Sequence, residues 1–242
     1  MNNMTRVSMI VLAALPAGAL IGCGGGSSSI ATTPPPTTFD LQTGIAGLVM
    51  NGQTASVTLS GTAIASGSSV PFTGSGTLTL APAQSATFNG AGALSQIETI
   101  SGTVTAAGQS APYSSSVTDF YATGNDAFVG ESGTNEYDVA QTAFTYPTTV
   151  MAGSSGILGT TSNYTDSTMG VAQGTTQVSY AVTATAGSSS SVMVAVTDQV
   201  YDTQSTLVDT DVTNYSLTDA GVLLLVSASV QNSSGTLTLT VQ

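Results

Sequence analysis

The stretch Val70-Pro-Phe-Thr-Gly-Ser-Gly-Thr-Leu-Thr-Leu80 places small or apolar residues at its even positions and Pro, Thr or Ser at its odd positions. Residues 177–186 and 236–241 alternate in the same way. A period of two in Thr, Val and Leu is typical of antiparallel strands with one buried face. These stretches predict an all-β protein. Beyond residue 22 we find no run with helical spacing of apolar residues.

The C-terminal third predicts an antiparallel meander of five strands, because turn-forming residues separate its alternating runs. The strands lie near residues 177–186, 191–201, 206–217, 222–231 and 236–241. The turns between them are Gly187–Ser190, Asp202–Ser205, Asp219–Gly221 and Asn232–Gly235.

Two further hairpin turns are predicted at Asn51-Gly52 and Asn89-Gly90, because Asn-Gly favours two-residue turns. An internal repeat with a period of 41 residues also relates positions 60–75 to positions 101–116. A strand, a Gly-centred turn and a returning strand with a proline would repeat in this way. Chance identity in a sequence rich in Ser, Gly and Thr is the open alternative.

Charge bears on how the strand edges are protected, since many proteins blunt exposed edges with lysine. The 242 residues include 13 Asp+Glu and only 1 Lys+Arg, which is Arg6. We therefore expect the antiparallel meander to form a closed or nearly closed barrel or a two-sheet sandwich. Edge-to-edge assembly with a partner is the alternative.

The same inventory excludes several kinds of function. The chain has no His, no Trp and one Cys, and its formal net charge is −12. No imidazole base, Schiff-base lysine or His-ligated metal is available. Nucleic acid is excluded as a partner, because phosphate binding needs cationic side chains.

The N-terminus predicts an exported protein. A short charged start, Met1–Arg6, is followed by an apolar run, Val7–Leu20, which is too short to span a bilayer as a stable helix. The run ends in Leu20-Ile21-Gly22-Cys23. This ending resembles the lipobox of bacterial lipoproteins, in a resemblance that covers residues 1–23 alone. An ordinary signal peptide that leaves Cys23 as a free thiol is the alternative.

The resemblance implies cleavage before Cys23 and attachment of lipid, including palmitate-type acyl chains, to that residue. Gly24 follows the cysteine where an Asp would favour inner-membrane retention, so the resemblance implies a lipid anchor in the outer membrane of the cell envelope. We divide the chain into a signal peptide (1–22), a lipidated Cys and Gly/Ser/Pro-rich linker (23–38) and an all-β domain (39–242). A sub-boundary near residues 147–175 is left open.

Most carboxylates fall into two stretches, and we interpret them as solvated surface charge that keeps the chain soluble. The stretches contain Asp119, Asp126, Glu131, Glu136, Asp138 and Asp198, Asp202, Asp209, Asp211. A pair of such acids running glycoside hydrolysis is the alternative. Because no side chain of the chain normally titrates between about pH 6 and 9, we expect stability to change little over that range.

The second acidic stretch raises a question of register. A two-residue turn at Thr203-Gln204 would place Asp198 opposite Asp209, an unfavourable pair of like charges. A slip by one residue would avoid this pair and is the preferred interpretation. A calcium ion bridging Asp198, Asp209 and Asp211 is the alternative, since hard cations prefer oxygen ligands.

Other chemical motifs are weak. Gly124–Gly130 resembles half of a calcium-binding nonapeptide repeat, with Asp126 as its ligand, but the leading glycines and a second copy are missing. We therefore interpret Asn125-Asp126 as a turn. No Gly-x-Ser-x-Gly motif is present, and the 8 tyrosines form no stripe. We assign no catalytic residue, no metal ligand and no cofactor.

We therefore expect a lipid-anchored envelope protein with a structural or interaction role and no catalysis. The alternative is a β-barrel carrier or binding module for a small apolar ligand or lipid, and a carboxylate-based hydrolase is a third. The membrane, reached through the anchor, is the expected partner, with a protein partner or an apolar ligand left open.

Replacing the lipid-attachment residue tests the anchor. Cys23→Ala removes the thiol that would carry the acyl chains, and each buried CH₂ contributes about 0.8 kcal/mol to membrane binding. We expect the variant to move from the membrane fraction to the soluble fraction on cell fractionation. Continued membrane association of Cys23→Ala would contradict the lipoprotein interpretation.

Overall fold

The computed structural model describes residues 37–65 and 67–242. The predicted leader, Cys23 and nearly all of the linker lie outside these described residues. The elements are α1 (Leu41–Asn51), β1 (Gln53–Ala65), β2 (Ser68–Leu80), β3 (Gln84–Phe88), β4 (Ala91–Ala106), β5 (Gln109–Ala122), β6 (Phe128–Gly133), β7 (Glu136–Ala140), β8 (Ser155–Tyr164), β9 (Ala172–Ala184), β10 (Ser191–Asp202), β11 (Leu207–Thr218), β12 (Leu223–Asn232) and β13 (Gly235–Val241).

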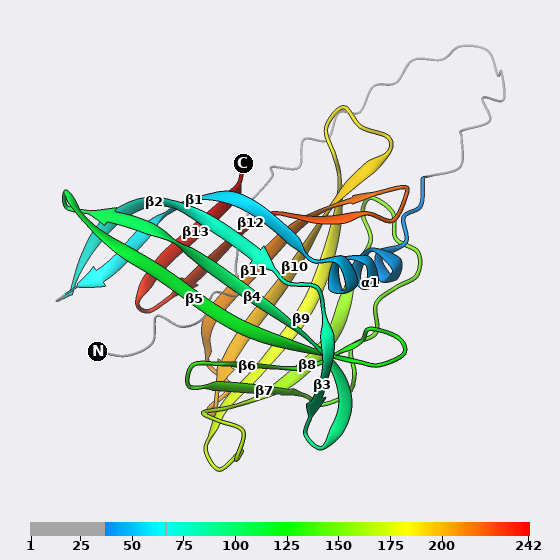
Figure 1. Ribbon diagram of the computed structural model, residues 1–242, viewed down its shortest axis with the longest axis horizontal. Coiled ribbons are helices and arrows are strands. Elements are labelled where there is room, and N and C mark those ends of the chain that lie inside the picture. The colour runs from blue at the N-terminus through cyan, green and yellow to red at the C-terminus, as the bar shows by residue number, and fades with distance from the viewer. Residues whose placement is uncertain (1–36, 66) are drawn as a thin grey trace, which may run out of the picture.

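The strands form one antiparallel sheet that closes on itself (Figure 1). Most neighbours in sequence are neighbours in the sheet, and β1 also pairs with the C-terminal strand β13. Pairing of β2 with β4 completes the circle, so twelve strands form the barrel and β3 is additional. The prediction of an all-β antiparallel fold is confirmed, and the barrel is the form adopted.

The sequence repeat corresponds to two hairpins with the same register. In the β1–β2 hairpin Ser60 pairs with Thr73, and in the β4–β5 hairpin Ser101 pairs with Ser114. Both members of the second pair are 41 positions beyond those of the first. The expected repetition of strand, turn and returning strand is therefore confirmed in the geometry of the two hairpins.

Small residues allow the barrel to close between these hairpins. Gly76 and Gly102 are paired across β2 and β4. A Cβ on Gly102 would lie 2.2 Å from the Ser75 carbonyl oxygen, and one on Gly76 would lie 2.2 Å from the Ser101 oxygen. Side chains here would push the two strands apart. Glycine thus permits the close approach of β2 and β4 at the point of closure.

Helix α1 covers one end of the barrel (Figure 1). It begins at the N-cap Asp40, whose carboxylate accepts a hydrogen bond from the Thr43 backbone N–H at 2.9 Å. Leu41 and Leu48 belong to a buried cluster with residues of β2, β9, β10, β11 and β12. The helix was not predicted, although Leu41, Ile45, Leu48 and Val49 have helical spacing over its short length. Among the described residues, no helix is both long and apolar enough to cross a membrane.

Part of the barrel interior is filled by apolar side chains. The inward residues of β1, β2, β4, β12 and β13 form a second cluster around Leu59, Leu78 and Leu239, which are essentially inaccessible to solvent. Burying each such side chain contributes about 1.5–3 kcal/mol. This cluster holds one side of the barrel together and leaves the side formed by β4 to β11 for other residues.

The β3–β4 hairpin adds a small cluster on the outside of the barrel. Asn89 and Gly90 form its turn with φ values of 49° and 78°, which confirms the predicted hairpin. Phe88 stacks on Phe120 at 4.5 Å and on Tyr137 at 5.2 Å between ring centroids. The hairpin is thereby fixed against the wall formed by β5 and β7.

The C-terminal meander is confirmed, since β9 to β13 match the five predicted strands and the four predicted turns join them. The predicted hairpin at Asn51-Gly52 is wrong. Gly52 instead ends α1, with φ of 67° and its N–H donating to the Leu48 carbonyl at 2.8 Å. Asn-Gly is equally suited to a helix C-terminus, where a left-handed residue is needed.

Alanine substitutions at two glycines of β4 test whether the close approach of β2 to β4 requires glycine. Gly102→Ala should destabilise the fold by about 1–3 kcal/mol, because its Cβ meets the neighbouring strand. Gly92→Ala is the matched control, since a Cβ there meets nothing within 4 Å, and its effect should stay within about 0.5 kcal/mol of zero or be mildly stabilising. Urea unfolding measures both, and equal effects would contradict this account of closure.

Candidate functional site

Eight of the 13 acidic residues have their side chains inside the barrel. Six line one interior cavity: Glu98, Asp119, Glu131, Glu136, Asp138 and Asp198. Asp209 and Asp211 are buried, and Asp211 is paired with Asp198 and so shares its face. The remaining acids lie at the helix cap, in loops or turns, or at the end of a strand: Asp40, Asp126, Asp166, Asp219 and, at the end of β10, Asp202.

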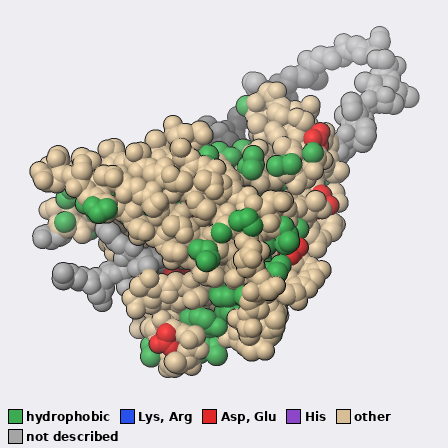
Figure 2. Space-filling model, viewed as in Figure 1, with side chains coloured by type: hydrophobic (Ala, Val, Ile, Leu, Met, Phe, Trp, Pro, Cys, Tyr) green, Lys and Arg blue, Asp and Glu red, His purple; other side chains and the backbone are tan. Residues whose placement is uncertain are grey.

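This placement corrects the interpretation of the acids as solvated surface charge. Within the described residues, the outward positions of the strands carry no acidic side chain, and the wall consists largely of Thr and Ser. Figure 2 accordingly shows few and separate acidic side chains on the face in view. The charge of the strands is therefore concentrated on the inner face of the barrel.

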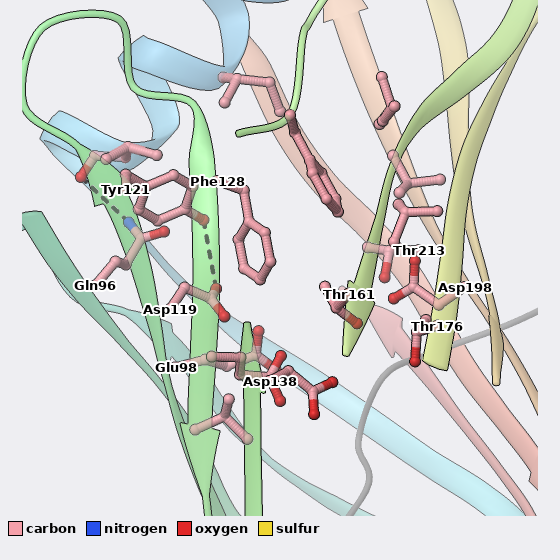
Figure 3. Close-up of a pocket in the computed structure, with 18 of the residues that line it drawn as sticks. Gln96, Glu98, Asp119, Tyr121, Phe128, Asp138, Thr161, Thr176, Asp198 and Thr213 are labelled. Carbon is pink, nitrogen blue, oxygen red and sulfur yellow. Dashed lines mark hydrogen bonds between the residues drawn. The ribbon is translucent and has the colours of Figure 1, made fainter. Parts of the chain in front are cut away.

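The cavity has a volume of about 170 Å³ and lies between α1 and the middle of the barrel. Acids and threonines line its walls, and aromatic and aliphatic side chains line the rest (Figure 3). Ile45, Leu48 and Val49 of α1 form part of its boundary. We define this space, with its lining residues, as the acidic lumen.

Strand register brings several acids side by side. Asp119 of β5 pairs with Glu131 of β6, which pairs with Asp138 of β7, and Asp138 is opposite Asn163 of β8. Directly paired residues share a face, and their Cβ atoms lie about 4.5–5.5 Å apart. The three carboxylates therefore follow one another across three adjacent strands.

The preferred register of β10 and β11 is wrong. Asp198 pairs with Asp211 and Val200 with Asp209, two positions from the register of a two-residue turn. The slip by one residue occurs only at Tyr201 and Leu207, and an irregularity after Val200 adds a further shift. Like charges thus do face each other, since Asp198 and Asp211 are directly paired.

Burial changes the acid-base properties of two acids in the lumen. Loss of hydration, together with the smaller effect of the neighbouring charge of Asp119, raises the pKa of Glu98 to about 8. Loss of hydration also raises the pKa of Asp119, while a hydrogen bond from the Tyr121 hydroxyl at 3.4 Å partly opposes the shift. Glu98 and Asp119 therefore gain or lose protons at a higher pH than ordinary carboxyl groups do.

Three tyrosines converge on the same acids. Tyr121, Tyr146 and Tyr215 all line the lumen. Burial raises the pKa of each hydroxyl above its ordinary value, and the charge of Asp119 contributes to all three shifts. Phe128 lies edge-on to Tyr121 with 6.0 Å between ring centroids. Aromatic rings and carboxylates thus face one small space, although the tyrosines show no pattern in the sequence.

Gln96 fixes the helix end of the lumen. Its side-chain amide donates to the carbonyls of Leu48, Val49 and Ala81 at 3.0, 3.2 and 3.0 Å. Leu48 and Val49 belong to the last turn of α1, and Ala81 follows β2, so the Gln96 side chain joins the helix end to the segment after β2. Gln96 therefore holds the helix in place against β4, next to Glu98.

A second, apolar space of about 220 Å³ lies in the half of the barrel formed by β1, β2, β4, β5, β12 and β13. Phe72, Val104, Tyr113 and Leu237 are among its lining residues. We call it the apolar chamber. Tyr113 is close enough to Glu98 for that charge to raise the pKa of its hydroxyl. The chamber and the acidic lumen are therefore neighbours.

Two observations bear on the hydrolase and calcium alternatives. A glycosidase pair needs one acid held protonated and another held ionised, whereas the pKa values of Glu98 and Asp119 are both raised. In the described residues, no three acidic, His or Cys side chains are grouped closely enough to hold a metal ion. Asn125 and Asp126 form the predicted turn, in which the Asn125 side chain accepts from the Ala127 N–H at 3.4 Å.

Several residues of the site were missed from the sequence: Gln96, Glu98, Phe128, Phe144, Tyr146 and Tyr215. The available signal was whether each acid shares an even or odd position number with the apolar residues of its strand, and therefore shares their face. Glu98 shares its parity with Ile100 and Val104, and Asp198 shares its parity with Val194 and Val196. An acid at a core-facing position of an otherwise apolar alternation points inward.

In comparisons with known proteins, no protein-family model, curated protein or solved structure matches the chain at a significant level. The class of the protein is therefore defined by its own geometry. It is a closed antiparallel β-barrel with an acidic lumen and a helix across one end.

The raised pKa of Glu98 predicts that stability depends on pH, in place of the flat profile expected from the sequence. The folded protein keeps Glu98 protonated up to about pH 8, whereas the unfolded chain ionises it near 4.5. The free energy of unfolding should therefore fall as the pH rises between these values and level off above them, by on the order of a few kcal/mol from this group.

Comparison with Glu98→Gln isolates this contribution. The variant cannot ionise at position 98, so its stability should exceed that of the parent by an increasing margin from pH 5 to pH 8. Denaturant unfolding at each pH measures the difference. Parallel stability curves for the two proteins would mean that Glu98 keeps an ordinary pKa in the fold.

Proposed function

We propose that the protein is a binding or carrier module that holds a small ligand inside its barrel. The observation that carries this proposal is a cavity of about 170 Å³ in the interior of the barrel, lined by both polar and apolar side chains. Ligand sites in proteins combine an apolar lining with a few convergent polar groups in this way. Small closed barrels also hold single ligands in their interiors.

The structure of the sheet favours this function over assembly through strand edges. Pairing of β2 with β4 uses the edges that a partner would need. β3 is paired on one side with β4 and is only 5 residues long. A structural role based on edge-to-edge addition therefore has little free backbone to use.

Attachment of this barrel to the outer membrane through Cys23 remains part of the proposal. It rests on the resemblance of residues 20–23 to a lipobox, and those residues lie outside the described part of the chain. Residues 24–38 are rich in Gly, Ser, Thr and Pro, a composition typical of linkers. A tethered barrel would bind its ligand close to the membrane surface.

Two threonine substitutions test whether the lumen is the binding site. Thr213 lines the acidic lumen, whereas Thr197 pairs with Val212 and Ser179 on the opposite face of the sheet. Thr213→Trp should fill much of the cavity and abolish binding of benzyl alcohol, a neutral molecule of suitable size. Thr197→Trp makes the same chemical change outside and should leave binding intact.

Ligand-detected NMR measures weak binding of this kind, and circular dichroism establishes that both variants are folded. Saturable binding that survives equally in both variants would place the ligand elsewhere. Absence of binding to the parent protein would remove the support for a small-ligand binding module.

A further inference from the structure

We propose that the acidic lumen selects small organic ammonium ions, which are molecules with a positively charged amine and a compact apolar body. This inference rests on the proposed binding function and specifies its ligand class. Three features support it: the placement of the carboxylates, the aromatic rings around them and the size of the cavity.

The carboxylates supply the negative field. Glu98 and Asp119 lie on neighbouring strands of one wall, and Asp198 lines the lumen from the side of β10 (Figure 3). An ammonium group carries only hydrogen-bond donors and a carboxylate only acceptors, so the two are complementary. An anionic ligand would be repelled from this space, because acids line it and residues 37–242 contain no Lys, Arg or His.

The aromatic rings supply a second attraction for the same charge. Tyr121, Tyr146, Tyr215, Phe128 and Phe144 all line the lumen. A cation held over such a ring gains about 0.5–2 kcal/mol, more where water is excluded. The same rings give the apolar body of the ligand a surface to contact. Neutral polar molecules of equal size would gain only the second of these effects.

The acids of the lumen can change their protonation state when a cation binds. The raised pKa of Glu98 shows that the empty site carries less negative charge than its composition implies. A bound ammonium ion would favour the ionised carboxylates. Binding of the cation is thereby coupled to release of protons from the acids that face it.

The size of the space limits the ligand. A cavity of about 170 Å³ is comparable to an engineered cavity of about 150 Å³ that binds benzene. A single-ring or short-chain amine fits this limit.

Benzylamine and benzyl alcohol form a matched pair of probes, since they have the same ring and nearly the same size and only benzylamine is charged at neutral pH. We expect benzylamine to bind about tenfold more tightly or better, which corresponds to about 1.4 kcal/mol. Titration followed by calorimetry or ligand-detected NMR measures the ratio. Displacement of both probes in Thr213→Trp places them in the lumen.

Isosteric variants identify the carboxylates that are responsible for the preference for benzylamine over benzyl alcohol. Glu98→Gln and Asp119→Asn, singly and together, should remove most of the preference for benzylamine while changing the affinity for benzyl alcohol little. Asp219→Asn is the control, because it removes one charge from a turn outside the lumen. Glu98→Gln removes an acid that is costly to ionise, so we expect it to remain folded.

The possible results separate the two proposals. Equal affinities for the two probes, both lost in Thr213→Trp, would overturn the selection of cations and leave the binding function standing. A preference for benzylamine that survives in the double variant, or that falls equally in Asp219→Asn, would overturn the assignment to Glu98 and Asp119. Absence of binding by either probe would overturn both proposals.

Discussion

Pairing between β2 and β4 is the interaction on which the rest of the structure depends. It joins the two repeated hairpins and turns a sheet with two exposed edges into a cylinder. The chain has almost no basic residues with which to protect a free edge. Closure solves this problem, and glycines such as Gly76 and Gly102 make it sterically possible. The interior created by closure then becomes the site.

Closure also explains the unusual division of charge. The outer wall is largely Ser and Thr, which hydrate well without charge, and most acids are enclosed. Enclosing carboxylates is costly, because an ionised group loses hydration. The fold meets part of this cost by keeping Glu98 protonated. Groups that are retained at a cost to stability are commonly found at functional sites. This cost is a reason for proposing that the lumen is the binding site.

The sequence predicted the strands well because alternation is a local property. The last five strands, the turn at Asn89-Gly90 and the common register of the repeated hairpins could all be inferred from neighbouring residues. Helix α1 was missed because its 11 residues provide only three turns of apolar spacing. Asn51-Gly52 was misassigned because the same dipeptide suits a hairpin and a helix end, and only the preceding helix decides between them.

The direction in which each acidic side chain faces could not be predicted from neighbouring residues in the sequence. The amino-acid sequence by itself determined that the strands alternate and that the chain has few cationic groups with which to bind anions. Whether a carboxylate faced water or the interior depended on which strands became neighbours and in what register, as the pairing of Asp198 with Asp211 illustrates. Those pairings join residues far apart in the chain, and their energies come from the packing of the whole barrel. Only the tertiary structure could therefore bring Glu98, Asp119 and the three tyrosines together around one cavity.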